Sequence, residues 1–188
     1  MSHDVALLRG INVGGQNLIK MTELVVCFEA LGFRDVSTYI QSGNVLFESP
    51  ASARAALTRR IEQALAKRFK YRASVVLRSA RQLRRIVTRA PKGFGAHPAK
   101  YRYDVIFLKE PLTAAAAMKS VPIKERVDQA HAGTGVLHFS RLISKASQSR
   151  LSRIASLSMY QSMTIRNWNT TTTLLRLMEG DSRAAEQP

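Results

Sequence analysis

The chain has very few of the residues that mark an oxidising compartment or a membrane segment. Its 188 residues include one cysteine, Cys27, so no disulfide can form within the chain, which suits a reducing cytoplasm. No stretch approaches the roughly 18 consecutive apolar residues that a membrane-spanning helix needs. The N-terminus carries Asp4 ahead of a brief apolar run, which is not the pattern of a secretory signal. We therefore expect a cytoplasmic protein without membrane partners, with Cys27 as a small buried residue.

Groups that hold metals or transfer protons are also scarce. The four histidines, at positions 3, 97, 131 and 138, lack the spacing of metal ligands and have no cysteine or carboxylate cluster beside them. His138 alternates with Leu137 and Phe139, so we expect it on the solvated face of a strand. We predict no metal and no cofactor. Acids are too few to suggest a catalytic carboxylate pair. The sequence does not decide between an enzyme and a binding protein, and it does not indicate an oligomeric state.

The shortage of acids gives the chain its most unusual property, a net charge of +16 from 29 basic and 13 acidic residues. The charge is concentrated between Arg54 and Arg102, where 15 basic residues accompany one acid, Glu62. That segment has a balance of +14, and the rest of the chain has +2. Such an asymmetry favours a polyanionic partner. The alternative is a solvated surface that binds nothing.

The hydrophobic pattern of the first half predicts the order strand, helix, strand, strand, helix, strand. We expect strands at 5–11, at 36–49 (two strands around a tight turn at Ser42 and Gly43) and at 73–77, with helices at 21–31 and 51–69. Leu57, Ile61 and Leu65 form one buried stripe of the second helix. This order is typical of the split β-α-β, or ferredoxin-like, unit.

The second half repeats this order less regularly. We expect helices at 81–88, 113–120, 147–158 and 171–179, strands at 103–108 and 163–167, and a hairpin through 133–135. The fold class is therefore predicted as α+β, with two ferredoxin-like units, the second less regular and followed by an extra C-terminal helix. The predicted domains are residues 1–92 and 93–180, followed by a disordered tail at 181–188.

The stretch LLRGINVGGQN, residues 7–17, has the glycine spacing of a phosphate-binding P-loop but not its chemistry. Gln16 and Asn17 stand where that motif needs a lysine for the phosphates and a hydroxyl for magnesium. Hydrolysis of nucleoside triphosphates is therefore excluded. Glycines between a strand and a helix still leave backbone N–H groups available for an anion. A tight crossover that needs small residues explains the same pattern.

Three strings in the chain, VALLRGINVGGQN, LGFRDVSTYIQSGNVLF and MTIRNWNT, resemble the signatures of a bacterial family catalogued as domain of unknown function 1697. The resemblance runs from about Asp4 to Met178 and implies a bacterial α+β protein, without implying an activity. It groups residues from the three strings, which we call the signature residues. They are Arg9, Gly10, Asn12, Gly14, Gly15, Tyr39, Gln41, Ser42, Gly43, Asn44, Arg166, Asn167, Trp168, Asn169 and Thr170.

Several of these residues have two interpretations. Asn169 or Thr170 can cap the last helix. Trp168 is either a core anchor or a platform on which bases stack. Tyr101 and Tyr103 alternate with basic residues. This pattern fits a nucleic-acid groove, and it also fits the first residues of a strand whose side chains reach solvent with their polar ends.

The first functional hypothesis is a basic protein that binds nucleic acid or another polyanion with little sequence specificity. Its predicted contacts are Arg59, Arg60, Lys67, Arg81, Arg84, Arg85 and Arg89, which the helical pattern turns away from the core.

The second hypothesis is a protein that binds a small anionic ligand such as phosphate, or an acylphosphatase-like hydrolase, that uses the loop at residues 10–17. The analogy with acylphosphatases is one of fold and loop. The site would have backbone donors and amides but no strong nucleophile, and its catalytic residues are unknown. Its predicted residues are Arg9, Gly10, Asn12, Gly14, Gly15, Gln41, Ser42, Asn44, Arg166, Asn167, Trp168 and Asn169.

Overall fold

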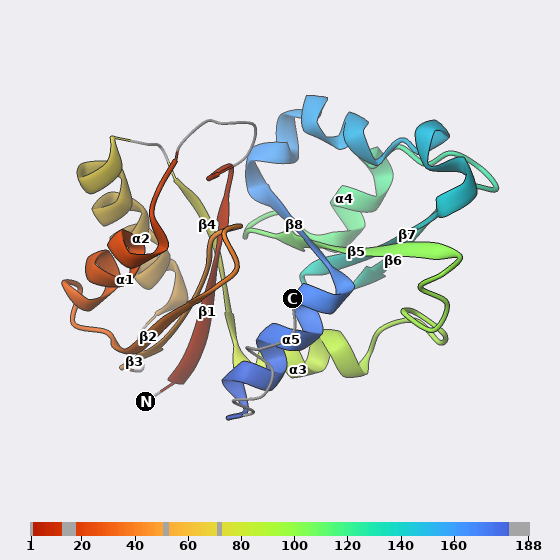
Figure 1. Cartoon of the computed structure of the whole chain (residues 1–188). Coiled ribbons are helices and arrows are strands. Elements are labelled where there is room, and N and C mark those ends of the chain that lie inside the picture. The colour runs from red at the N-terminus through yellow and green to blue at the C-terminus, as the bar shows by residue number, and fades with distance from the viewer. Residues whose placement is uncertain (1, 13–17, 51–52, 71–72, 181–188) are drawn as a thin grey trace. The chain divides into compact units, whose positions relative to one another are not determined.

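The protein is described here by a computed structural model that covers residues 2–12, 18–50, 53–70 and 73–180 (Figure 1). Its contacts divide it into two compact units, Met1–Leu83 with Thr173–Pro188, and Arg84–Thr172. The division falls inside the helix at residues 80–88. The predicted disordered tail lies outside the described residues.

The first unit has the predicted order of strands and helices. Its elements are β1 (Ser2–Arg9), α1 (Met21–Glu29), β2 (Arg34–Tyr39), β3 (Asn44–Ser49), α2 (Arg54–Phe69) and β4 (Ser74–Ser79). The strands form one sheet in the order β2-β3-β1-β4, and each neighbouring pair is antiparallel. This is the sheet order of a split β-α-β unit, so the α+β prediction is confirmed here.

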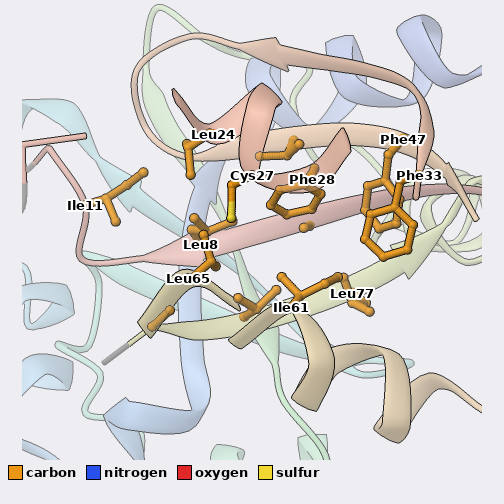
Figure 2. Packing of buried hydrophobic residues seen from close by; sticks show 14 of the residues in the cluster. Leu8, Ile11, Leu24, Cys27, Phe28, Phe33, Phe47, Ile61, Leu65 and Leu77 are labelled. Carbon is orange, nitrogen blue, oxygen red and sulfur yellow. The ribbon is translucent and has the colours of Figure 1, made fainter. Parts of the chain in front are cut away.

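The core of the first unit lies between one face of this sheet and the helices α1 and α2 (Figure 2). Leu57, Ile61 and Leu65 of α2 are buried at intervals of four residues, as the helical pattern predicts. The rings of Phe28, Phe33 and Phe47 pack with centroids 4.7–5.9 Å apart. Cys27 belongs to the same cluster, and burial raises the pKa of its thiol, so the prediction of a buried small residue is confirmed.

The second unit contains the other sheet, with the strand order β6-β7-β5-β8 and antiparallel pairs throughout. Its strands are β5 (Tyr101–Leu108), β6 (Asp128–Gly133), β7 (Val136–Leu142) and β8 (Met163–Asn167), and α4 (Ala114–Ser120) follows β5. Helices α3 (Ala80–Thr88) and α5 (Trp168–Met178) each begin in one unit and end in the other. Both sheets therefore have the same strand order, and α5 is the extra C-terminal helix.

The predicted helix at 147–158 is wrong. Residues 143–162 form three short 3-10 helices, η1 (Ile143–Gln148), η2 (Leu151–Ser156) and η3 (Ser158–Ser162). Leu151, Ile154, Leu157 and Tyr160 recur every three residues and pack against the core of the second unit. A spacing of three fits the three residues per turn of a 3-10 helix, and the many serines hydrogen-bond locally and weaken an α-helix.

The chain contains no membrane-spanning helix within the described ranges, since none of the helices there is long and apolar enough.

Gly43, in the turn between β2 and β3, has a φ of 77°. It packs closely against Leu8 and Ile11, at and just after the end of β1. A Cβ atom there would lie 2.7 Å from Cδ1 of Ile11 and 2.9 Å from Cβ of Leu8. Gly32 has the same φ of 77° but no atom within 4 Å of such a Cβ. The two glycines therefore separate the cost of the backbone conformation from the cost of crowding.

We predict that Gly43→Ala lowers the free energy of unfolding more than Gly32→Ala does. Both variants bear the left-handed backbone cost of about 1–2 kcal/mol. Only Gly43→Ala adds overpacking against Leu8 and Ile11, which costs about 1–3 kcal/mol more. Urea unfolding of the two variants measures the difference, and equal decreases would contradict the close packing of this turn.

Candidate functional site

Asn12, in the stretch that resembles a P-loop, has a φ of 53°. The Asn12 amide nitrogen donates to the carbonyl oxygens of Ile19 and Gln41, both at 3.0 Å, and its amide oxygen accepts from the backbone N–H of Ile19 at 2.8 Å. These hydrogen bonds join Asn12 to Ile19 and to Gln41. Gly14 and Gly15 lie outside the described residues, so the proposed anion contacts of this loop stay a prediction.

The second group of signature residues forms the turn next to this loop. The buried Asn44 amide donates to the carbonyl oxygen of Tyr39 at 2.9 Å and to Oγ of Ser42 at 3.0 Å. The N–H of Leu8 donates to the carbonyl oxygen of Gly43 at 2.8 Å. The structure therefore brings the Asn12 and Asn44 side chains to one region of the first unit, where their described hydrogen bonds stabilise the turns.

Two further residues of this predicted site, Arg9 and Gly10, precede Asn12 on the chain. Arg9 ends β1 and is half-buried, and the exposed Gly10 has a φ of 72°.

The third string belongs to the second unit. Arg166 is buried on β8, and its Nη1 donates to Oγ1 of Thr164 at 2.9 Å and to the carbonyl oxygen of Ile165 at 2.8 Å. Burial lowers the pKa of Arg166 to about 10, which leaves it charged at neutral pH. Asn167 follows it at the end of β8 and is exposed.

Helix α5 begins three residues before the predicted start, and its cap differs from the prediction. Oδ1 of Asn167 accepts a hydrogen bond of 2.7 Å from the N–H of Thr170, which is the contact of a helix N-cap. Asn169 and Thr170, the predicted caps, therefore lie inside the first turn of the helix.

Trp168 belongs to an aromatic cluster centred on Phe94, in the segment between α3 and β5. The Phe94 ring packs edge-on against Tyr103 at 4.9 Å, against Trp168 at 5.0 Å and against His138 at 5.1 Å, measured between ring centroids. Gly95 follows with a φ of 87°, and a Cβ there would lie 2.6 Å from Cδ1 of Trp168 and closer still to its Nε1. Trp168 is thus a packing anchor for this segment, although it remains partly exposed.

The prediction that His138 lies on a solvated strand face is wrong. Only 2% of His138 is exposed, because the cluster around Phe94 and the end of α3 cover this face of β7. Its Nε2 lies 3.2 Å from the carbonyl oxygen of Ile86. Burial lowers the pKa of His138, so a neutral imidazole that donates its Nε2 proton to Ile86 fits this site. Alternation marks one face of the strand as apolar but does not tell whether the other face is covered.

A cleft of about 240 Å³ opens beside this cluster, and we call it the Tyr101 cleft. It lies on the face of the second sheet that carries Tyr103, Ser140 and Gln129, which are neighbours across β5, β7 and β6. The segment between α3 and β5 forms the other wall. Its characteristic lining residues are Lys92, His97, Tyr101, Tyr103, His131 and Ser140.

A second hollow of about 160 Å³ shares Tyr101 and Tyr103 with the cleft. Its other lining residues are Pro98, Arg102, Asp104, Asn167, Trp168 and Asn169. Three of the predicted site residues therefore do lie together in one hollow. Burial raises the pKa of Asp104, and the nearby Arg141, whose Nη2 lies 3.6 Å from Oδ2 of Asp104, opposes that shift. This hollow combines a buried carboxylate with the exposed Arg102, whereas none of the described residues that line the Tyr101 cleft is acidic.

The predicted nucleic-acid contacts occupy the surfaces of two helices. The residues Arg59, Arg60, Lys67, Arg81, Arg84, Arg85 and Arg89 are all exposed. In the first unit Arg60 already has an internal role, since its Nη2 donates to the carbonyl oxygen of Leu31 at 2.6 Å. On α3 the buried residues are Leu83 and Ile86, and the arginines lie on the opposite side.

Sequence reasoning missed Lys92, His97, Gln129, His131 and Ser140 as possible ligand contacts. The alternation of Tyr101 and Tyr103 with basic residues was the one local signal for this region. The other residues come from segments about 30 to 40 residues apart in the chain, which only the pairing of β5, β6 and β7 brings together. In the described residues no group of three or more His, Cys, Asp or Glu side chains is placed to hold a metal ion.

We predict that Gly95→Ala destabilises the protein more than Gly93→Ala. Both glycines have a positive φ, but a Cβ at Gly93 would meet no atom within 4 Å, whereas one at Gly95 would clash with the Trp168 ring. Gly93→Ala should cost about 1–2 kcal/mol of unfolding free energy. Gly95→Ala should cost about 1–3 kcal/mol more. Chemical denaturation followed by the fluorescence of Trp168, the single tryptophan, measures both; equal decreases would argue against the cluster.

We also predict that stability falls as the pH falls below about 6.5, in part because of His138. The unfolded chain takes up a proton on this imidazole near pH 6.5, whereas the folded protein, with its lowered pKa, does so only at lower pH. The unfolded state therefore binds more protons in this window, so acid favours unfolding. Urea unfolding at a series of pH values should show a weaker pH dependence for His138→Gln. His97→Gln, at an exposed position, is the control. An unchanged slope in His138→Gln would contradict the assignment.

Comparison with known proteins gives a family and a structural relative. A family model described as "Protein of unknown function (DUF1697)" matches residues 1–138, which include the first two signature strings. None of the curated proteins matches the chain. Among solved structures, the conserved bacterial protein SP0830 from Streptococcus pneumoniae is similar, with 26% identity, a TM-score of 0.79, and coverage of 94% of this chain and 98% of that chain. Because the family model matches well over half of its length, the chain belongs to the DUF1697 family.

Proposed function

We propose that the protein binds nucleic acid with little sequence specificity, through the arginines of α3 and Arg89 directly after it. The observation that carries the proposal is the arrangement of Arg81, Arg84, Arg85 and Arg89, which we call the arginine face. At about 100° per residue these positions span an arc of roughly 140° on one side of the helix. All four are exposed, and the buried residues of α3 lie on the other side.

The arginine face suits a phosphate backbone better than a single small anion. Four exposed guanidinium groups at residues 81–89 can neutralise several of the closely spaced phosphates of a nucleic acid. The sequence of α3 itself contains no acidic residue. The following segment adds the exposed Lys92 and Lys100.

Other basic residues of the segment from Arg54 to Arg102 support the fold. Arg54 pairs with the buried Asp4, at 3.0 Å between Nη1 and Oδ1. Arg78 is buried, and its Nη1 donates to the carbonyl oxygen of Leu77 at 2.8 Å. The proposal therefore depends on the arginine face and does not need the whole charge of +14. A location in the bacterial cytoplasm accompanies the proposal, because nucleic acids are found there.

We predict that changing Arg81, Arg84, Arg85 and Arg89 together to Gln weakens binding to short DNA duplexes and to short RNA duplexes by a similar factor. For each phosphate that the variant no longer neutralises, the slope of log affinity against log salt should decrease by about 0.9 on duplex DNA. The weakening should be independent of base sequence, because arginines that bind phosphates read no bases. Fluorescence anisotropy across a salt series measures the slope.

A matched control removes four other exposed positive charges from the second unit, at Lys119, Lys124, Arg126 and Arg153. The two variants have the same net charge, so only the position of the removed charges differs. Equal weakening by both would mean that the effect is one of net charge alone. No binding at low salt, or binding that the four arginine changes leave intact, would refute the proposal.

A further inference from the structure

The Tyr101 cleft has the charge of an anion site. None of the described residues that line it is acidic, and Lys92, His97 and His131 contribute an ammonium group and two imidazoles. The carboxylate of Asp104 lines the neighbouring hollow and not the cleft. Beside Lys92 and His97 an anionic group meets no carboxylate of the described lining, whereas in the hollow Asp104 accompanies the basic Arg102.

The cleft also offers an aromatic surface. The rings of Tyr101 and Tyr103 lie 6.1 Å apart, and both remain partly exposed. Tyr103 is fixed by Phe94 and by its hydroxyl, which accepts a hydrogen bond of 3.3 Å from the N–H of His97. Tyr101 is the less constrained ring, and Nζ of Lys100 lies 5.5 Å from its centroid. A ring beside cations, in a cleft with hydroxyl and amide groups, suits a flat polar group that carries a negative charge.

The size of the cleft limits what it can hold. At about 240 Å³ it is smaller than the clefts of roughly 300–1,000 Å³ that enclose drug-sized ligands. One base with its phosphate partly outside is a reasonable occupant. A base is available for such stacking only when it is unpaired.

The position of the cleft in the chain connects it with the arginine face. Lys92 follows Arg89 by three residues, and the N–H of Arg89 continues the helical hydrogen bonding of α3 to the carbonyl oxygen of Arg85 at 3.1 Å. Arg84, Arg85 and Arg89 belong to the same unit as the cleft. The aromatic cleft therefore lies close in the protein sequence to the arginines that would contact the phosphates of a single strand.

We propose that the Tyr101 cleft binds one unpaired nucleotide of a single-stranded nucleic acid, with the base against Tyr101 and the phosphate beside Lys92 and His97. This inference rests on the proposed nucleic-acid binding and extends it from the phosphate backbone to a base. It predicts that single strands fill the cleft and also contact the arginine face, whereas duplexes contact the arginine face alone.

The test compares labelled single-stranded oligonucleotides with duplexes of the same sequence, and adenosine monophosphate, by fluorescence anisotropy or competition. The variants are Tyr101→Ala, Tyr101→Phe and Lys92→Gln, with Lys119→Gln on α4 as the charge-matched control. Tyr101→Ala should weaken single-strand binding by at least about fivefold, the lower end of the effect of one stacked base. Tyr101→Phe should keep this binding, and duplex affinity should change by less than about twofold. Lys92→Gln should weaken single-strand binding more than Lys119→Gln does.

Tyr101 is partly buried at the start of β5, so a native circular dichroism spectrum must first show that Tyr101→Ala folds. Lys92→Gln changes an exposed loop position and tests the cleft independently of Tyr101. Unchanged single-strand affinity in both Tyr101→Ala and Lys92→Gln would overturn the inference. If only the four changes on the arginine face then weakened binding, the proposed function would stand without the cleft. If the unmodified protein bound no oligonucleotide, both proposals would fail. Binding of adenosine monophosphate alone would assign the cleft to a free nucleotide and overturn the inference for strands.

Discussion

The packing of Phe94 against the second sheet is the interaction on which the candidate site depends. This ring contacts Tyr103, His138 and Trp168, which come from β5, β7 and the first turn of α5. It fixes the segment between α3 and β5 against the sheet, and that segment supplies one wall of the Tyr101 cleft. The burial of His138 and the need for glycine at position 95 follow from the same packing.

The two units use different chemistry to hold the same sheet order. In the first unit, amide side chains stabilise the turns: Asn12 joins its loop to Gln41, and Asn44 closes the turn after Tyr39. In the second unit, aromatic rings cover the sheet and leave a cleft with polar and basic walls. The first two signature strings are thus explained largely by folding, whereas the third lines a hollow beside Tyr101.

Local patterns predicted most of the elements. The stripe of Leu57, Ile61 and Leu65 identified α2, and the glycines at 133 and 135 identified the hairpin of β6 and β7. The same rules failed at residues 147–158, where a spacing of three resembles that of an α-helix. They also failed at His138, whose burial depends on Phe94 and Ile86, some 40 to 50 residues away. The cleft could not be predicted, because its lining residues meet only through strand pairing.

The most direct test of the proposed binding surface is a map of the nucleic-acid contacts by backbone amide NMR. A ¹⁵N-labelled protein titrated with a short single-stranded oligonucleotide should show its largest shift changes at Arg84–Arg89 and in the segment from Lys92 to Tyr103. The opposite face of the second sheet, around α4, should change little. Shift changes confined to α4 and the 3-10 helices, or to Asn12 and its partners Ile19 and Gln41, would contradict the claim that the arginine face and the Tyr101 cleft form the binding surface.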